Sequence, residues 1–250
     1  MRWTDNHCHL PDDIDAATQV VASAKEAGVT RLIDVGTSVG HSIQCLRRAK
    51  EFDGVWCTAG VHPHDAKDGL EGLEDLLTAP EVVALGECGL DYYYDNSPRD
   101  VQRNIFAEQI HLAHKYQMPL VIHTRDAWED TFEILDTEGV PTNTVFHCFT
   151  GGPDEAKEGL QRDIYLSFSG IVTFPNAPEL RDALAITPSD RYMVETDAPY
   201  LAPVPQRGKP NQPAWVLHVG EKMASVRGIE LNQLAEESWR NASHFYGLDG

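Results

Sequence analysis

Short apolar runs, rich in β-branched and aromatic residues, alternate along the chain with longer runs whose apolar residues recur at helical spacing. The short runs predict strands at residues 2–5, 31–35, 55–61, 82–86, 120–123, 144–149, 165–169 and 192–196. The longer runs predict helices at residues 14–27, 40–52, 70–78, 98–116, 127–137, 153–161 and 177–185, with two more after residue 214. Glycine or proline follows most of these helices, as is common at helix ends.

This alternation predicts a single (β/α)8 barrel that occupies residues 1–250. A chain of 250 residues has the usual length of such a barrel. The predicted strands are continuously apolar, as expected for parallel strands that are buried on both faces. An open doubly wound sheet is the alternative, but the first strand is followed by HCHLP at residues 7–11 and not by a glycine-rich phosphate turn.

The composition is that of a globular protein with an acidic surface. Hydrophobic residues form 42% of the chain, which is enough for a large core. No apolar run approaches the roughly 18 residues of a membrane span, and the first residues lack a signal-peptide pattern. We therefore expect a cytoplasmic protein without membrane contact. The net charge of −19 argues against a protein that coats nucleic acid, but not against an enzyme that binds phosphate locally.

Residues that can bind metal ions stand at or just after the ends of the predicted strands. Packing gives a core strand no reason to end repeatedly on histidine or a carboxylate, whereas in a barrel all these ends meet on one face. A typical mononuclear catalytic zinc has about three protein ligands, so the larger set here indicates one or two divalent ions, Mg²⁺, Mn²⁺ or Zn²⁺. The predicted ligands are His7, His9, Glu87, His123, His147 and Asp197.

Glu87 is the residue on which a two-ion site depends, because its two carboxylate oxygens can bridge two ions. We expect one ion to be held by Glu87, Asp197 and the two histidines of the first strand. The second ion is expected to be held by Glu87, His123 and His147.

Four further residues lie close to these positions in the sequence. Asp91 is expected either to orient a ligand or to cap a turn. His62 and His64 follow the third strand and could be ligands too, but six ligands are already assigned. Contact with substrate or support of a ligand is favoured for His62, and an exposed place in the loop is an equally good expectation for His64. Glu195 shares a face with Asp197 and needs a polar partner inside the barrel or a place in a turn.

Several motifs together resemble the TatD family of metal-dependent deoxyribonucleases, within the amidohydrolase-like barrels. The strongest are GECGLDYY at residues 86–93, PLVIHTRDA at 119–127 and ETDAPYL at 195–201; DNHCHL at 5–10, GVHP at 60–63 and RGKPN at 207–211 also agree. Their order along nearly the whole chain makes the resemblance specific. It implies a (β/α)8 barrel with a mono- or dinuclear site at the same six positions, which cleaves DNA, often as a 3′–5′ exonuclease.

We therefore expect hydrolysis of phosphodiester bonds in single-stranded DNA by a metal-activated water, carried out by a monomer. Asp197 is the expected proton acceptor, and Glu87 is its catalytic partner at the metal. The candidates for binding phosphate oxygens are His62, Arg125, Arg207 and Lys209. The last two could equally be solvated side chains of a loop.

Two other classes of function stay open at this point. One is a hydrolase of another phosphoester, an ester or a cyclic amide on the same barrel, because a fold alone does not select a substrate. Glu87 argues against amide cleavage, since many amide-cleaving relatives carry a carboxylated lysine there. The other is a non-catalytic module that binds a metal or a partner protein.

Overall fold

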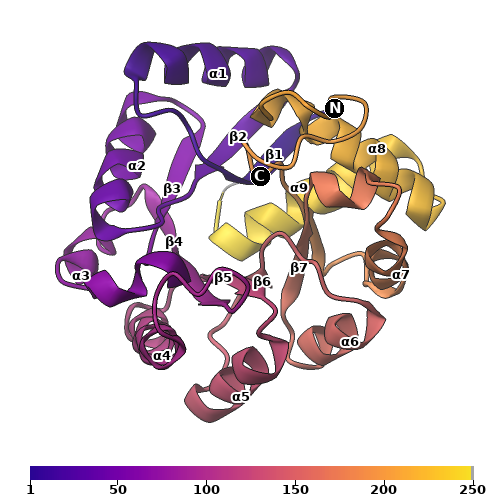
Figure 1. The fold of residues 1–250 in the computed structure, drawn as a ribbon. Helices are drawn as coiled ribbons and strands as arrows, with labels where there is room; N and C mark the ends of the chain where they lie inside the picture. Colours follow the sequence, from indigo (N-terminus) through magenta and orange to yellow (C-terminus); the bar gives the residue numbers. More distant parts are fainter. Residues whose placement is uncertain (249–250) are drawn as a thin grey trace.

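Eight parallel strands form a nearly closed barrel in the computed structural model, which describes residues 1–248 (Figure 1). They follow the order of the sequence, and each pairs with the next. The strands are β1 Trp3–Cys8, β2 Val29–Asp34, β3 Val55–Ala59, β4 Val82–Asp91, β5 Leu120–Arg125, β6 Thr144–Phe146, β7 Tyr165–Phe168 and β8 Tyr192–Val194. The predicted (β/α)8 barrel is confirmed.

Helices surround the strands as an outer ring (Figure 1). The α-helices are α1 Ile14–Glu26, α2 Val39–Glu51, α3 Leu73–Leu76, α4 Arg99–Tyr116, α5 Trp128–Glu138, α6 Pro153–Gln161, α7 Pro178–Ile186, α8 Val216–Arg227 and α9 Leu231–Tyr246. Short 3₁₀ helices lie at Pro63–Asp68, Gly170–Thr173 and Pro213–Trp215. None of the described helices is both long enough and apolar enough to cross a membrane.

The helix predicted at 70–78 is the largest error in the predicted elements. Only the single turn of α3 forms there, because Gly72 directly before it has a φ of 86° and so interrupts the helical backbone. Strand ends differ as well. The first strand continues to Cys8 and the fourth to Asp91, whereas the strands predicted at 144–149 and 192–196 stop at residues 146 and 194.

The apolar interior of the barrel is closed at one end by α9. Phe245 and Tyr246 pack inside against strand residues such as Ile33, Val121 and Met193. The hydroxyl of Tyr246 donates a hydrogen bond to the backbone carbonyl of Asn6 over 3.1 Å. A larger core fills the space between the strands and the outer helices.

Backbone bonds beyond the last strand complete the barrel. The N–H of Asp197 donates to the carbonyl of His7 over 2.9 Å, and the N–H of His9 donates to the carbonyl of Ala198 over 2.7 Å. These two bonds place the segment after β8 directly beside the end of β1. Residues that lie 190 positions apart in the sequence thereby become neighbours.

Candidate metal centre

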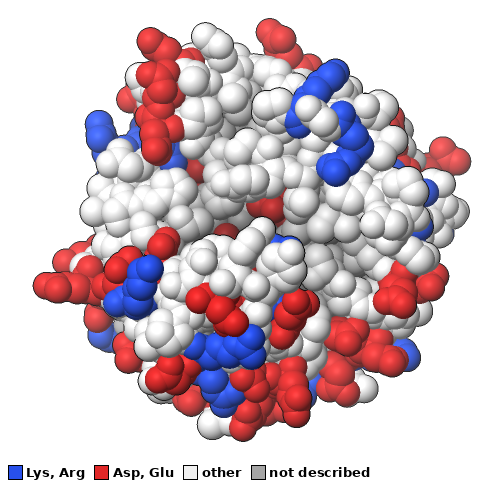
Figure 2. Space-filling view, viewed as in Figure 1, with Lys and Arg blue, Asp and Glu red and all other residues white. Residues whose placement is uncertain are grey.

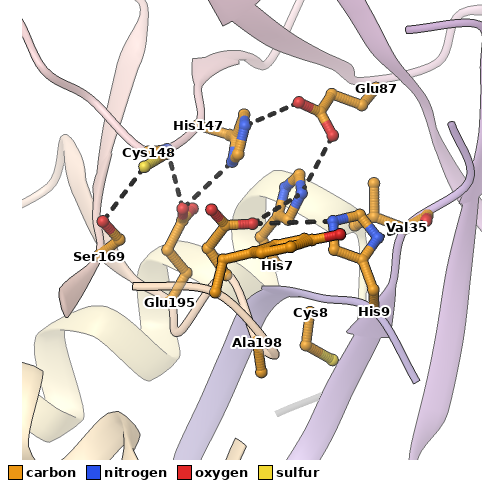
Figure 3. Close-up of polar contacts among 12 residues, drawn as sticks. His7, Cys8, His9, Val35, Glu87, His147, Cys148, Ser169, Glu195 and Ala198 are labelled. Carbon is orange, nitrogen blue, oxygen red and sulfur yellow. Dashed lines mark hydrogen bonds and ion pairs between the residues drawn. The ribbon is translucent and has the colours of Figure 1, made fainter. Parts of the chain in front are cut away.

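Glu87 is buried and contacts a cluster of four histidines, of which Figure 3 shows His7 and His147. Its Oε1 atom is 2.9 Å from His147 Nε2, 3.0 Å from His123 Nδ1 and 3.4 Å from His62 Nε2. Its Oε2 atom is 3.3 Å from His7 Nε2. One carboxylate therefore presents both oxygens to imidazoles that come from four different strands or the loops that follow them.

A bulge in β4 puts Glu87 in this position. Leu85 pairs with Leu120 while Cys88 pairs with Ile122, so β4 contains one extra residue at this point. Gly86 has a φ of 141°, and a Cβ atom there would lie 2.6 Å from the carbonyl oxygen of Val121. Only glycine fits such a site, and the bulge it permits sets the direction of the glutamate side chain.

Asp197 and the two histidines of β1 adjoin Glu87. The Oδ1 atom of Asp197 is 3.7 Å from His9 Nε2 and 3.9 Å from His7 Nε2. The Nδ1 atom of His9 is 3.1 Å from the carbonyl oxygen of Val35. Because a carbonyl only accepts hydrogen bonds, this contact places the proton of a neutral His9 on Nδ1 and leaves the Nε2 lone pair facing the cluster.

The surroundings of His7 fit a metal ligand. Its side chain is completely buried, and neither ring nitrogen has a hydrogen-bond partner among the described residues. Burying an unpaired polar group is costly, and coordination of a cation would satisfy it. Three groups of possible ligand atoms each lie within 4.8 Å of one another: His7, His9 and Glu87; His62, Glu87 and His123; and His7, His147 and Asp197. Since two of these groups share Glu87, the donor set suits one ion or two.

Two further carboxylates hold the outer nitrogens of the histidines. Glu195 Oε1 accepts from His147 Nδ1 over 3.2 Å and from the backbone N–H of Cys148 over 2.8 Å (Figure 3). Asp91 Oδ2 lies 3.0 Å from His123 Nε2 and 3.1 Å from His64 Nε2. Carboxylates that orient histidines in this way are typical of metal sites.

Both alternatives for Asp91 are found together. While Oδ2 faces the two histidines, Oδ1 accepts the backbone N–H groups of Tyr93 and Tyr94 over 3.0 and 2.9 Å. The same side chain therefore holds a histidine of the cluster and caps the turn after β4. Glu195 has its polar partner inside the barrel, which was one of the two outcomes expected for it.

The local electrostatics favour anionic carboxylates. Burial alone raises the pKa of Glu87, but His147, His62 and His7 outweigh this effect and bring the pKa well below its usual value. Burial lowers the pKa values of His7 and His62 and so favours their neutral forms. Burial also opposes a charge on His147, yet Glu87 and Glu195 raise its pKa well above normal, so a cation that binds there displaces a proton.

His62 lies closer to the predicted ligands than its place in the sequence required. Its imidazole contacts Glu87 as closely as that of His7 does, which fits the expected support of a ligand and also makes His62 a possible ligand. The signal was present, because His62 follows the end of a predicted strand like the other histidines. His64 is also not a free loop residue, since its ring contacts Asp91.

The three cations that the sequence predicts to contact phosphate have partners outside the histidine cluster. The guanidinium of Arg125 lies over the rings of Tyr93 and Tyr94, at 4.0 and 4.9 Å from their centres. Arg207 lies 4.0 Å over the ring of Phe174, and Lys209 donates to Gln206. In the described part of the chain, no hydrogen bond or ion pair joins any of the three cations to the cluster.

The middle of the face drawn in Figure 2 is hollowed, and acidic side chains are visible inside the hollow. Mostly uncharged residues surround it. Basic side chains gather over the segment that follows β8, which is orange in Figure 1. This distribution of charge favours a cation within the hollow and leaves positive charge at its edge.

Comparison with known proteins agrees with this geometry. A sequence model described as TatD related DNase matches residues 4–247. The chain is 41% identical to the "uncharacterized metal-dependent hydrolase YcfH" of Escherichia coli K12, over 100% of this chain and 97% of that protein. It is 38% identical to the "3'-5' ssDNA/RNA exonuclease TatD" of Citrobacter rodentium, over 92% and 91%.

A solved structure shows the same fold. The crystal structure of YjjV, a TatD homologue from Escherichia coli K12, superposes with a TM-score of 0.91 and 26% identity, covering 99% of each chain. Matches that span nearly the whole length leave no part of the barrel unaccounted for. The chain therefore belongs to the TatD-related DNase family, and the protein is a metal-dependent hydrolase of that family.

Proposed function

We propose that the protein hydrolyses phosphodiester bonds of single-stranded DNA from the 3′ end, as a monomer in which residues 1–250 act as one catalytic domain. One or two divalent ions, Mg²⁺, Mn²⁺ or Zn²⁺, would be held by His7, His9, Glu87, His123, His147 and Asp197. The observation that carries the proposal is Glu87, whose two oxygens face imidazoles from different strands. The name of the Citrobacter relative supports the choice of nucleic acid as substrate.

The side chains divide the chemical work between them. Divalent ions would supply positive charge that stabilises the phosphate and would lower the pKa of a bound water molecule. Asp197 is suited to accept the proton, because its side chain is 14% exposed whereas that of Glu87 is 4% exposed. Burial raises the pKa of Asp197, but the neighbouring His9 and the charge of His147 outweigh this effect and lower the pKa, so the carboxylate stays ionised and able to act as a base.

The residues expected to hold phosphate lie at two positions. His62 is within the cluster, and Arg125 ends β5 two residues after His123, so both are candidates to contact the scissile group. Arg207 and Lys209 lie on the exposed segment after β8 and would contact phosphates farther along the strand. Their charges would offset locally the net charge of −19, which disfavours approach of a polyanion.

Digestion of 5′-end-labelled single-stranded DNA in Mg²⁺, Mn²⁺ or Zn²⁺ tests the proposal. We expect a ladder of products shortened from the 3′ end, and loss of the ladder in Glu87→Gln. Asp154→Asn is the matched control, because it removes an exposed carboxylate that only pairs with Lys157. An intact oligonucleotide in the presence of folded, metal-loaded wild-type protein would show that the natural substrate is of another kind.

Parallel reactions decide the finer points. RNA and duplex DNA of the same sequence test the preference for single-stranded DNA, and a lactone and a dihydropyrimidine test the other hydrolase reactions. Size-exclusion chromatography with light scattering tests the monomer. Metal analysis of the purified protein reports whether one or two ions are bound.

A further inference from the structure

Three aromatic side chains remain exposed although the fold places the others at least partly inside. Within residues 1–248, every phenylalanine and tryptophan is buried or half-buried. The exceptions among the tyrosines are Tyr93, Tyr94 and Tyr200, which are 58%, 55% and 62% exposed. Packing does not account for these three rings, because an aromatic ring gains most of its stabilisation from burial.

Two of the tyrosines contact histidines in or next to the candidate metal centre, and Tyr93 packs against one of these tyrosines. The ring of Tyr94 stands edge-on to His64, with 5.4 Å between the ring centres. The ring of Tyr200 stands edge-on to His9, with 6.1 Å between the centres. His64 reaches Glu87 through Asp91 and His123, while His9 reaches it through Asp197 and His7. Tyr94 and Tyr200 therefore lie at the two ends of this series of side-chain contacts.

Contacts with Arg125 and Asp91 hold the neighbouring rings of Tyr93 and Tyr94 in place. Tyr93 and Tyr94 pack edge-on, with 4.8 Å between their centres, and Arg125 lies over both rings. Their backbone N–H groups both bind Asp91. The carboxylate that orients His123 thus also positions this pair of rings.

Tyr200 is positioned by its backbone. Its N–H donates to the carbonyl of Asp197 over 2.8 Å, and its carbonyl accepts from the side chain of Asn211 over 2.6 Å. Because one of these partners is Asp197, the two bonds anchor the backbone of Tyr200 beside the cluster. An exposed ring on an anchored backbone is suited to stacking, because less of the chain has to be ordered on binding.

We propose that Tyr93 and Tyr94 at one end, and Tyr200 at the other, stack on the nucleobases on either side of the scissile phosphate. This inference rests on the proposed nuclease function. Stacking on aromatic rings tolerates every base, which suits an enzyme that degrades a strand without regard to sequence. It also supplies affinity that does not depend on charge, which matters for a protein with a net charge of −19.

The test compares Tyr94→Ala and Tyr200→Ala with Tyr94→Phe and Tyr200→Phe, using metal-loaded protein. Substrates are an oligothymidylate and an oligomer of the same length made of abasic residues. Loss of base stacking is expected to raise KM for the oligothymidylate by about 5- to 150-fold, with little change in kcat. The phenylalanine variants should keep the wild-type KM, because they keep the ring. Tyr116→Ala is the matched control, since this tyrosine ends α4 and bonds to Glu74.

Two results would overturn the proposal: an unchanged KM in both alanine variants, or an equal loss on the abasic oligomer, which would indicate a structural role. Binding of a hydrolysis-resistant phosphorothioate oligothymidylate, followed by fluorescence anisotropy, separates this question from catalysis. If the wild-type protein binds this oligomer through the tyrosines but cleaves no DNA, the nuclease proposal fails, and of the stacking proposal only the contact between tyrosines and nucleobases stands. If it cleaves DNA while the variants bind normally, the reverse holds. If it neither binds nor cleaves, both fail.

Discussion

A buried ion pair behind the metal centre allows a quantitative test of how the segment of His9 is held. Arg48 of α2 donates from Nε to Asp34 Oδ2 at the end of β2, over 2.7 Å. The other oxygen of Asp34 accepts the backbone N–H of Leu10 over 3.1 Å. The pair thus joins α2 and β2 to the residue that follows His9. Arg48→Met removes the charge and keeps an apolar stem of similar length.

The expected cost follows from burial. The side chain of Asp34 is completely buried, so without Arg48 its charge would keep, among residues 1–248, only the hydrogen bond from Leu10. Breaking a buried pair in this way typically costs about 3–5 kcal/mol of unfolding free energy. Arg48 also contacts Asp12, but that carboxylate is 81% exposed, and loss of such a contact costs at most about 1 kcal/mol. Asp12→Asn is therefore the mild control.

Urea unfolding of the metal-free protein measures these differences. The double variant Asp34→Asn with Arg48→Met should be more stable than Arg48→Met alone, because the amide oxygen can still accept the bond from Leu10 and no charge is left buried. Metal titration of the same variants reports whether His9 has moved. A loss below about 1 kcal/mol in Arg48→Met, or a double variant less stable than the single one, would refute this explanation of the pair.

Three further predictions concern other parts of the barrel. Burial raises the pKa of Asp5 to about 8, so the folded state keeps a proton that the unfolded chain releases above about pH 4. With EDTA present to remove metal, the free energy of unfolding should therefore fall by about 1.4 kcal/mol per pH unit between about pH 4 and pH 8, and Asp5→Asn should not show this fall. Urea unfolding that gives the same pH dependence for both proteins would contradict this prediction. Gly220→Ala brings a Cβ atom within 2.4 Å of Trp3 and should lower the free energy of unfolding by about 1–3 kcal/mol. Gly40→Ala, whose Cβ atom would have no other atom within 4 Å, should raise it by up to about 1 kcal/mol. A higher melting temperature for Gly220→Ala than for Gly40→Ala would contradict the packing described. Glu195→Gln should weaken Mn²⁺ or Zn²⁺ binding about 10- to 100-fold in calorimetry, and unchanged affinity would mean that its bond to the cluster is unimportant.

The sequence by itself determined the barrel and the positions in the chain from which the cluster is built. Alternation of strand and helix patterns is a local property, and local patterns are what a sequence displays directly. In a parallel barrel all strands end on the same face, so polar residues such as His7, Glu87 and Asp197 had to converge wherever the strands stopped. The convergence did not require knowledge of any single contact.

Only the tertiary structure decided which side chains touch. His62 joined the cluster because the turn after β3 directs its ring at Glu87, which strand order alone does not reveal. Asp91 took on two roles because its two oxygens face different partners. Arg125, at the end of β5, lies against tyrosines of the loop after the neighbouring strand β4. Such contacts depend on bulges, strand register and left-handed residues, and a shift of one residue along a strand turns a side chain to its other face.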